Sequence, residues 1–276
     1  MGRTLYLNES AGDLYVKRDG PSVWITARET AGRRVPARLL SRVVVMGNVK
    51  LDAGAITLFT ENDIPVVFMD NSAEETAMAI PYNHRLPRHY EEQKVFLESE
   101  ENASRYEKWA QAKRAVLQTA MLQRLDRSLS GQLTFGIGEG NYQQVLAGLK
   151  PKSKDKWSVI TGIINSLFRG LIMEHILKAD LDPHTGVIHR RHNFGFVLDI
   201  CYIVGAESDM QAVQFFRADR QAVLMEKRNN GWRATEPGMR KIIHRFENRR
   251  VQLSNLIGTV MDEAFELMRE LSASIH

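Results

Sequence analysis

The order of apolar and polar residues divides the chain into two parts with different predicted structure. In residues 1–80, short runs of β-branched and aromatic residues alternate with turn residues, which is typical of strands. The runs TLYLN and DLYVKRDG on either side of Gly12 predict a hairpin, and PSVWITA predicts the next strand. The stretch RVVVMGNVKLDAGAITLFTENDIPVVFMD then predicts a strand, a helix from about Asp52 to Glu61, and a strand opened by Pro65.

Beyond Arg85 the apolar spacing becomes helical. Residues 91–129 are rich in Glu, Ala, Lys and Leu and contain neither Pro nor Gly. Residues 157–178 and 253–271 repeat apolar side chains at i, i+3 and i+4, as in an amphipathic helix. We therefore predict an α+β protein. Its small β-rich N-terminal domain (residues 1–80) is followed by a larger, all-helical C-terminal domain (residues 81–276), and residues 71–84 form the linker.

Composition narrows the class of protein. The 276 residues are 43% hydrophobic and 25% charged, which is ordinary for a globular chain. The single cysteine, Cys201, excludes a disulfide within the chain and a multi-cysteine zinc site, and it suits a reducing cytoplasm. No run approaches the roughly 18 apolar residues of a membrane span, and the N-terminus has no signal-peptide core. We expect a cytoplasmic protein without a membrane partner.

Charge is unevenly placed, although the net charge is only +4. Between Arg217 and Arg250 there are ten Lys or Arg residues against four acids. Such an excess favours a face for a polyanion, and the alternative is a helix with ordinary ion pairs. The candidates for contact with a polyanion in this stretch are Arg240, Lys241, Arg245 and Arg249.

The segment DPHTGVIHRRHNFGFVLDI places three histidines and two aspartates within nineteen residues. Asp199 stands among aliphatic residues near its end, where a carboxylate is costly to desolvate unless its charge is compensated. Either Asp199 turns to solvent or it meets a cation. A histidine-only zinc site is disfavoured, because no HExxH motif is present and metal-binding pairs on a helix prefer i, i+4 spacing.

A second candidate segment is FGIGEGNYQQVLAGL, with glycines at 136, 138 and 140. Their spacing and the long helix before them do not match a dinucleotide-binding loop. Two interpretations of Glu139 stay open: a solvated residue in a helix-breaking turn, or a carboxylate held at a helix start beside a ligand. His189 and Asp199, ten residues apart, could converge with Glu139 on one cation. One imidazole with carboxylates suits Mn²⁺ or Mg²⁺.

Taken together, these segments resemble the CRISPR spacer-acquisition integrase family. GIGEGN resembles its Glu-Gly motif, LDPHTGVIH the segment that ends in its active-site histidine, and FGFVLDI the segment of its acidic residues. The stretch VVVMGNVKLDAGAITLFTENDIPVVFMD also resembles the N-terminal strand-helix-strand of the family. The resemblance implies that Glu139, His189 and Asp199 are the catalytic residues and the ligands of Mn²⁺ or Mg²⁺.

One position departs from the family pattern. Tyr202 stands where the family usually has a second acid, three residues after the first. A tyrosine at its ordinary pKa is a poor ligand for these metals. Either Glu139, His189 and Asp199 hold the metal alone, or the site is weakened or lost.

The resemblance implies a metal-dependent DNA integrase and endonuclease, which inserts short foreign DNA fragments into a CRISPR repeat array by transesterification. It further implies a homodimer through the β-rich domain and a small companion adaptation protein. Double-stranded DNA would be held through its phosphates, with Arg190 and Arg191 beside the site as contacts. The alternatives are a DNA-binding scaffold with a decayed site, and a related integrase of a mobile element.

Overall fold

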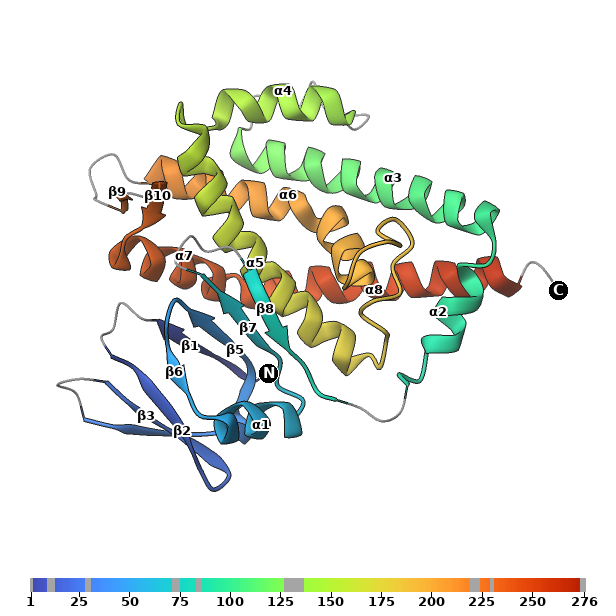
Figure 1. Cartoon of the computed structure of the whole chain (residues 1–276). Helices are drawn as coiled ribbons and strands as arrows, with labels where there is room; N and C mark the ends of the chain where they lie inside the picture. The colour runs from blue at the N-terminus through green and yellow to red at the C-terminus, as the bar shows by residue number, and fades with distance from the viewer. Residues whose placement is uncertain are drawn as a thin grey trace. The chain divides into compact units, whose positions relative to one another are not determined.

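The computed structural model describes residues 2–8, 13–27, 31–70, 75–82, 86–126, 137–218, 224–228 and 231–273. The chain divides into two compact units, coloured along the sequence in Figure 1. The first unit comprises Met1–Arg85 and Val223–Arg240, and the second comprises Leu86–Ala222 and Lys241–His276. The first is rich in strands and the second in helices, so the structure confirms the predicted α+β class.

Two four-stranded sheets make up the N-terminal part of the first unit among the described residues. The first sheet has the order β1 (Arg3–Asn8), β5 (Leu40–Met46), β7 (Val66–Met69) and β8 (Glu75–Ala79). Its first three strands are parallel, and β8 pairs with β7 in the antiparallel sense. The second sheet has the order β4 (Arg33–Pro36), β3 (Ser22–Thr26), β2 (Tyr15–Asp19) and β6 (Lys50–Leu51). A short 3-10 helix, η2 (Ala37–Leu39), joins β4 to β5.

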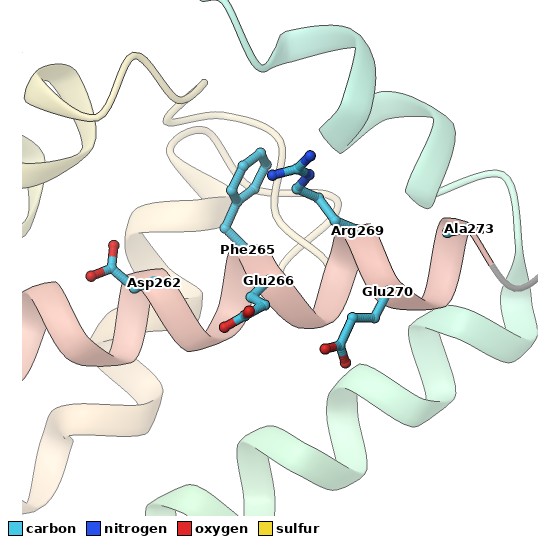
Figure 2. A pocket seen from close by; sticks show the side chains of 6 residues that line it. All are labelled: Asp262, Phe265, Glu266, Arg269, Glu270 and Ala273. Carbon is cyan, nitrogen blue, oxygen red and sulfur yellow. The ribbon is translucent and has the colours of Figure 1, made fainter.

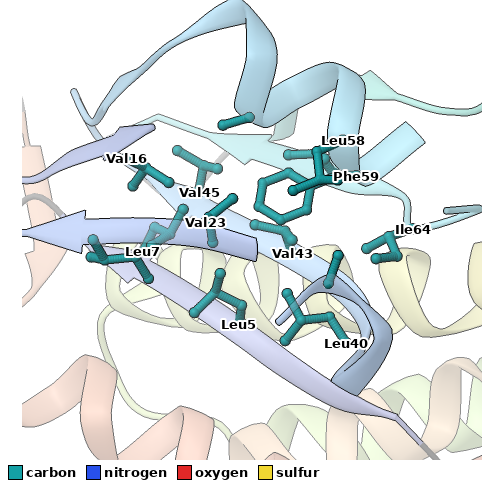
Figure 3. Close-up of a cluster of buried hydrophobic side chains, with 14 of the residues drawn as sticks. Leu5, Leu7, Val16, Val23, Leu40, Val43, Val45, Leu58, Phe59 and Ile64 are labelled. Atoms are coloured by element: carbon teal, nitrogen blue, oxygen red, sulfur yellow. The ribbon is translucent and has the colours of Figure 1, made fainter. Parts of the chain in front are cut away.

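One apolar core unites these two sheets with helix α1 (Ala53–Glu61). Figure 3 shows Val16 and Val23 of the second sheet and Val43 of the first beside Phe59 of α1. All four side chains are fully buried. The helix starts where the sequence predicts, because the Asp52 side chain accepts a hydrogen bond from a backbone N–H of its first turn.

Two sequence predictions for this unit are wrong. β1 and β2 do not form a hairpin, because β1 pairs with β5 and β2 pairs with β3 and β6; the residues around Gly12 lie outside the described ranges. The predicted linker contains β8, whose alternating small and apolar residues pair with β7. The sequence analysis also missed the antiparallel pair β9 (Met225–Arg228) and β10 (Gly231–Ala234), which belongs to the first unit.

The second unit is built from helices. They are α2 (Tyr90–Phe96), α3 (Glu100–Leu125), α4 (Glu139–Leu149), α5 (Lys154–Lys178), α6 (Gly195–Ala218), α8 (Arg250–Ala273) and the later part of α7 (Glu236–Asn248). The single helix predicted for residues 91–129 is two helices, and residues 127–129 lie outside the described ranges. The break comes at Ser99, whose side chain accepts a hydrogen bond from Asn102 N and so begins α3.

Helix α6 is the centre of this unit, because α3, α5 and α8 all pack against it. The buried side chains of α6 include Ile200, Ile203 and Val204. Helix α5 is the one described helix that is long and apolar enough to cross a membrane, and 67% of its most apolar window is buried inside the protein. Burial of that kind is typical of a core helix. Since α5 packs against α6, a functional side chain on α6 is carried by a well-packed helix.

Candidate functional site

The loop between α5 and α6 carries the three clustered histidines and is closed around Asp182. One oxygen of Asp182 accepts hydrogen bonds from His184 N, from Thr185 N and from the Thr185 hydroxyl, each at 2.8 Å. Gln93 of α2 accepts a hydrogen bond from Asp182 N at 2.7 Å and donates one to Asp182 O at 3.2 Å. These contacts fix the loop from its first residues onward.

Two glycines let the end of this loop lie against the start of α6. A Cβ on Gly186 would lie 2.3 Å from the carbonyl carbon of Gly195. A Cβ on Gly195 would lie 2.6 Å from the carbonyl oxygen of His189. Neither position has room for a side chain, so close backbone approach requires glycine at both. The approach brings the backbone of residues 187–189 to Asp199.

Asp199 is fully buried on α6 and accepts four hydrogen bonds. Its Oδ2 accepts from Val187 N at 2.6 Å and from Ile188 N at 3.1 Å. Its Oδ1 accepts from His189 N at 2.9 Å and contacts His189 Nδ1 at 2.7 Å. Burial raises the pKa of Asp199, and these four hydrogen bonds oppose the rise. The buried carboxylate is thus compensated by backbone N–H groups and an imidazole.

His189 is oriented by this contact. Since Asp199 Oδ1 accepts a hydrogen bond, Nδ1 carries the proton and Nε2 keeps its lone pair in the neutral ring. The His189 side chain is 28% exposed, so the ring is reachable from outside. Its ring centroid lies 5.6 Å from that of His192 and 6.5 Å from that of Tyr202. The structure therefore joins two of the three predicted site residues into one fixed pair.

Glu139, the third predicted residue, begins α4 after Gly138. Its carboxylate accepts hydrogen bonds from four nitrogens, which belong to three side chains. Arg114 donates through Nε at 3.1 Å and through Nη2 at 3.3 Å. Gln118 and Gln143 donate through their amides at 2.7 Å and 2.8 Å. The Arg114 hydrogen bonds, followed by those of the two glutamines, lower the pKa of Glu139 to about 2. Glu139 is therefore an exposed carboxylate that is held in place by three side chains.

Arg114 also connects Glu139 to Tyr202, the residue that differs from the family pattern. Its Nη1 donates to the backbone carbonyl oxygen of Tyr202, and its guanidinium carbon lies 4.6 Å from the centroid of the Tyr202 ring. Sequence reasoning missed Arg114, which lies on α3, 25 residues from Glu139 and 88 from Tyr202. The one sequence signal is weak: Arg114 and Gln118 are spaced i, i+4 and so share a helix face.

Two groups could serve a divalent metal as ligands: His189 Nε2 and, once its hydrogen-bond donors are displaced, the Glu139 carboxylate. Such a pair suits Mn²⁺ or Mg²⁺ when water and substrate phosphate oxygens complete the coordination. Both oxygens of Asp199 are already hydrogen-bonded, so direct ligation by Asp199 would require the loss of a donor. Among the described residues, no group of three or more His, Cys, Asp or Glu side chains is placed to hold a metal ion.

The predicted DNA-contacting residues have different surroundings. Arg190 donates to Glu100 at 3.0 Å and to the Val187 carbonyl at 3.1 Å, whereas Arg191 is exposed. Arg240 has a side chain that is 78% exposed and pairs with Glu236. Of these residues, Arg191 and Arg240 present the most accessible charge, and phosphate binding by either stays a prediction.

The remaining basic candidates lie further along α7 and at its end. Arg245 donates to Gln214 at 2.8 Å, and Arg249, between α7 and α8, pairs with the buried Glu207 at 2.9 Å. Burial and the charge of Arg249 lower the pKa of Arg245. Lys241 is half-buried. The break between α7 and α8 means that Arg245 and Arg249 do not follow one continuous helix, and their phosphate contacts stay a prediction.

A pocket of about 460 Å³ lies along α8, and none of the site residues discussed so far lines it. It is lined by Asp262, Phe265, Glu266, Arg269, Glu270 and Ala273. Figure 2 shows that Phe265 and Arg269 project to the same side of the helix. None of the predicted catalytic residues lines this pocket, so it is separate from the Glu139 and His189 contacts.

Comparison with known proteins places this arrangement in context. The family model described as CRISPR associated protein Cas1 matches residues 5–145, which is 141 of the 276 residues and includes Glu139. No curated protein matches the chain. Among solved structures, a Cas1 protein from Thermotoga maritima superposes with a TM-score of 0.77 at 15% identity, covering 96% of this chain and 97% of that one.

Two further structures share the fold. A casposase bound to integration product gives a TM-score of 0.76 at 17% identity, covering 98% of this chain and 91% of the casposase. A chain of a Cas6-RT-Cas1–Cas2 complex gives 0.74 at 13% identity, covering 98% of this chain and 35% of that longer one. At these identities the likeness establishes the fold, and the family rests on the sequence match.

Proposed function

The chain belongs to the CRISPR-associated Cas1 family of integrases and nucleases, and from this premise we propose that it inserts short DNA fragments into a CRISPR repeat array. The proposed reaction is a transesterification. The 3′-hydroxyl oxygen of the fragment forms a bond to a repeat phosphorus, and the repeat's own 3′-oxygen leaves as a hydroxyl. The number of phosphodiester bonds is conserved, so no covalent enzyme intermediate is required.

The observation that carries this proposal is the pairing of His189 with Asp199. A fully buried carboxylate is costly to desolvate, and a side chain buried this deeply is usually apolar. Here the carboxylate instead fixes the ring of a half-buried histidine and the backbone that bears it. Fixing a ligand or proton-carrying ring in one orientation is what catalysis requires of a supporting carboxylate. We therefore propose that Asp199 is a positioning residue that acts through His189.

Metal dependence is part of the proposal. When bound, Mn²⁺ or Mg²⁺ would polarise the scissile phosphate and stabilise the charge that develops on its oxygens. The residues that would hold it are Glu139 and His189, with Asp199 behind the histidine. Arg191 and Arg240 are the candidates that would hold the DNA backbone, because their charges are the most accessible.

We also propose the assembly that the family resemblance implies: a homodimer that works with a small companion adaptation protein on double-stranded DNA in the cytoplasm. Relatives with this fold occur in a Cas6-RT-Cas1–Cas2 complex and in a casposase bound to integration product. The casposase also keeps open an integrase role in a mobile element, which a neighbouring repeat array would argue against.

A second candidate function is a DNA-binding scaffold without chemistry. Two observations favour it: Tyr202 stands at the position of a family acid, and Arg114 already occupies the Glu139 carboxylate. A scaffold would bind DNA and its protein partners but would not join DNA ends.

Strand transfer tests the proposal. A labelled duplex with free 3′-hydroxyls is incubated with a supercoiled repeat plasmid and Mn²⁺, with the companion protein present and absent. Wild type should join the DNA, and His189→Ala should reduce joining by about 100-fold or more. His184→Ala is the matched control, because its ring accepts a hydrogen bond from Phe194 N rather than contacting Asp199. It should retain joining within a few-fold.

The scaffold has a different signature in the same assay. If neither wild type nor Tyr202→Asp joins DNA while both bind it tightly, the integrase proposal fails and the scaffold stands. If Tyr202→Asp gains joining over an inactive wild type, the site has decayed at that residue.

A further inference from the structure

The contacts of Arg114 show a cation already present at the proposed metal site. The Arg114 side chain is only 13% exposed, although a guanidinium is always charged. It faces both oxygens of Glu139 through Nε and Nη2, which is the bidentate geometry of a strong charge-assisted pair. A largely covered arginine with such a partner is part of the architecture of the site.

The carboxylate of Glu139 has no coordination site left over. Its two oxygens offer about four lone-pair positions. Four N–H donors from Arg114, Gln118 and Gln143 take these positions. A divalent ion that binds Glu139 must therefore displace donors, and displacing the guanidinium also leaves a buried positive charge beside the metal.

Tyr202 supplies the other half of the Arg114 site. Its ring lies 4.6 Å from the guanidinium carbon, within cation–π range, and its carbonyl accepts a hydrogen bond from Nη1. An acid at this position would offer a charge for a metal, whereas the neutral ring offers a flat face for a guanidinium. Tyr202 and Arg114 thus form a matched pair, in which each side chain stabilises the position of the other.

We propose that Arg114 is the resident cation of Glu139 and opposes divalent-metal binding there. This inference rests on the proposed function, because it concerns the metal that the function would use. It goes beyond that function by naming the residue that sets the metal affinity of the free protein. Wild type without DNA should bind Mn²⁺ weakly, and loss of the Arg114 charge should strengthen binding.

A titration of the protein with Mn²⁺ tests the role of Arg114 without DNA and without an activity assay. Binding is measured by calorimetry and by the electron paramagnetic resonance signal of free Mn²⁺. Arg114→Met should bind at least about tenfold more tightly than wild type, the factor that one charge-assisted hydrogen bond is worth. Adding Tyr202→Asp to it should tighten binding again. Adding Glu139→Gln to Arg114→Met should abolish the gain.

Arg124→Met is the matched control. Arg124 also lies on α3, and its Nη1 lies 3.0 Å from a carboxylate oxygen of Glu207 on α6. This variant should bind Mn²⁺ as wild type does. Arg114→Gln is the second variant in case methionine prevents folding, because glutamine keeps an N–H donor without the charge; circular dichroism identifies the folded variants.

Two results would overturn the inference. The first is a folded, charge-free Arg114 variant that binds Mn²⁺ no more tightly than wild type. The second is a gain that survives Glu139→Gln. A failure of strand transfer by wild type would instead count against the proposed function, and the Mn²⁺ titration would still decide the role of Arg114.

Discussion

Replacing Asp199 by asparagine tests how the site is held. Asparagine keeps one of the two oxygens, so its amide group must face two N–H donors that the carboxylate now accepts. Two hydrogen bonds to a charged group are lost, at about 1.5–3 kcal/mol each. The neutral amide is less costly to bury than the carboxylate, which offsets part of that loss of free energy. We expect Asp199→Asn to lower the free energy of unfolding by about 3 kcal/mol, since the loop is otherwise unchanged.

The measurement is urea unfolding at neutral pH, followed by tryptophan fluorescence. Asp182→Asn is the control in the same loop, because the three hydrogen bonds that its side chain accepts from His184 and Thr185 go to one oxygen, which asparagine retains. It should cost less than about 1 kcal/mol. If Asp199→Asn unfolds within about 0.5 kcal/mol of wild type, or Asp182→Asn loses as much, then Asp199 does not clamp the histidine loop.

Three further predictions follow from the same contacts. Gly186→Ala should lower the melting temperature by several degrees, because its Cβ would lie 2.3 Å from the carbonyl carbon of Gly195. Gly258→Ala is the control, because open space surrounds Gly258 on α8, and it should not lower the melting temperature. Equal melting temperatures for the two variants would argue against the tight loop. In metal-free buffer, Glu139→Gln should cost about 1 kcal/mol at neutral pH, a value discounted because the Glu139 side chain is 52% exposed. The depressed pKa of about 2 means that this stabilisation is present above about pH 4.5 and is lost as the pH falls toward 2, so urea titrations that show a constant deficit would contradict it. Arg191→Ala should weaken DNA binding and reduce the salt slope of log K by about one, as measured by fluorescence anisotropy, and an unchanged slope would exclude a phosphate contact.

Local patterns predicted much of this fold. Strand β5, with its run of three valines, is buried at all seven positions, and the helix after Asp52 begins at its cap. These features depend on residues close together in sequence, so the local pattern of apolar and polar residues predicts them. The failures involve pairing between distant segments. β1 pairs with β5 rather than with β2. β9 and β10 belong to the first unit, although they lie far from its other strands in sequence. Nothing in a short window specifies such partners.

The site divides in the same way. The family motifs singled out Glu139, His189 and Asp199. For Asp199 the sequence left two alternatives, exposure to solvent or contact with a cation; the structure shows it buried, with hydrogen bonds compensating its charge. The compensating groups could not be predicted, because three of them are backbone N–H groups that a loop brings together only when folded. Arg114 reaches the site from another helix, so its role appears only in three dimensions.

The central claim is that His189, held by Asp199, serves DNA transesterification. Because the reaction conserves phosphodiester bonds, it runs in reverse on a branched DNA that mimics its product, without a plasmid or a repeat array. The most direct measurement is the single-turnover rate at which saturating protein resolves such a branch in Mn²⁺. We predict resolution by wild type, and rates reduced by about 100-fold for His189→Ala with DNA affinity unchanged. Equal rates for wild type and His189→Ala would contradict the account.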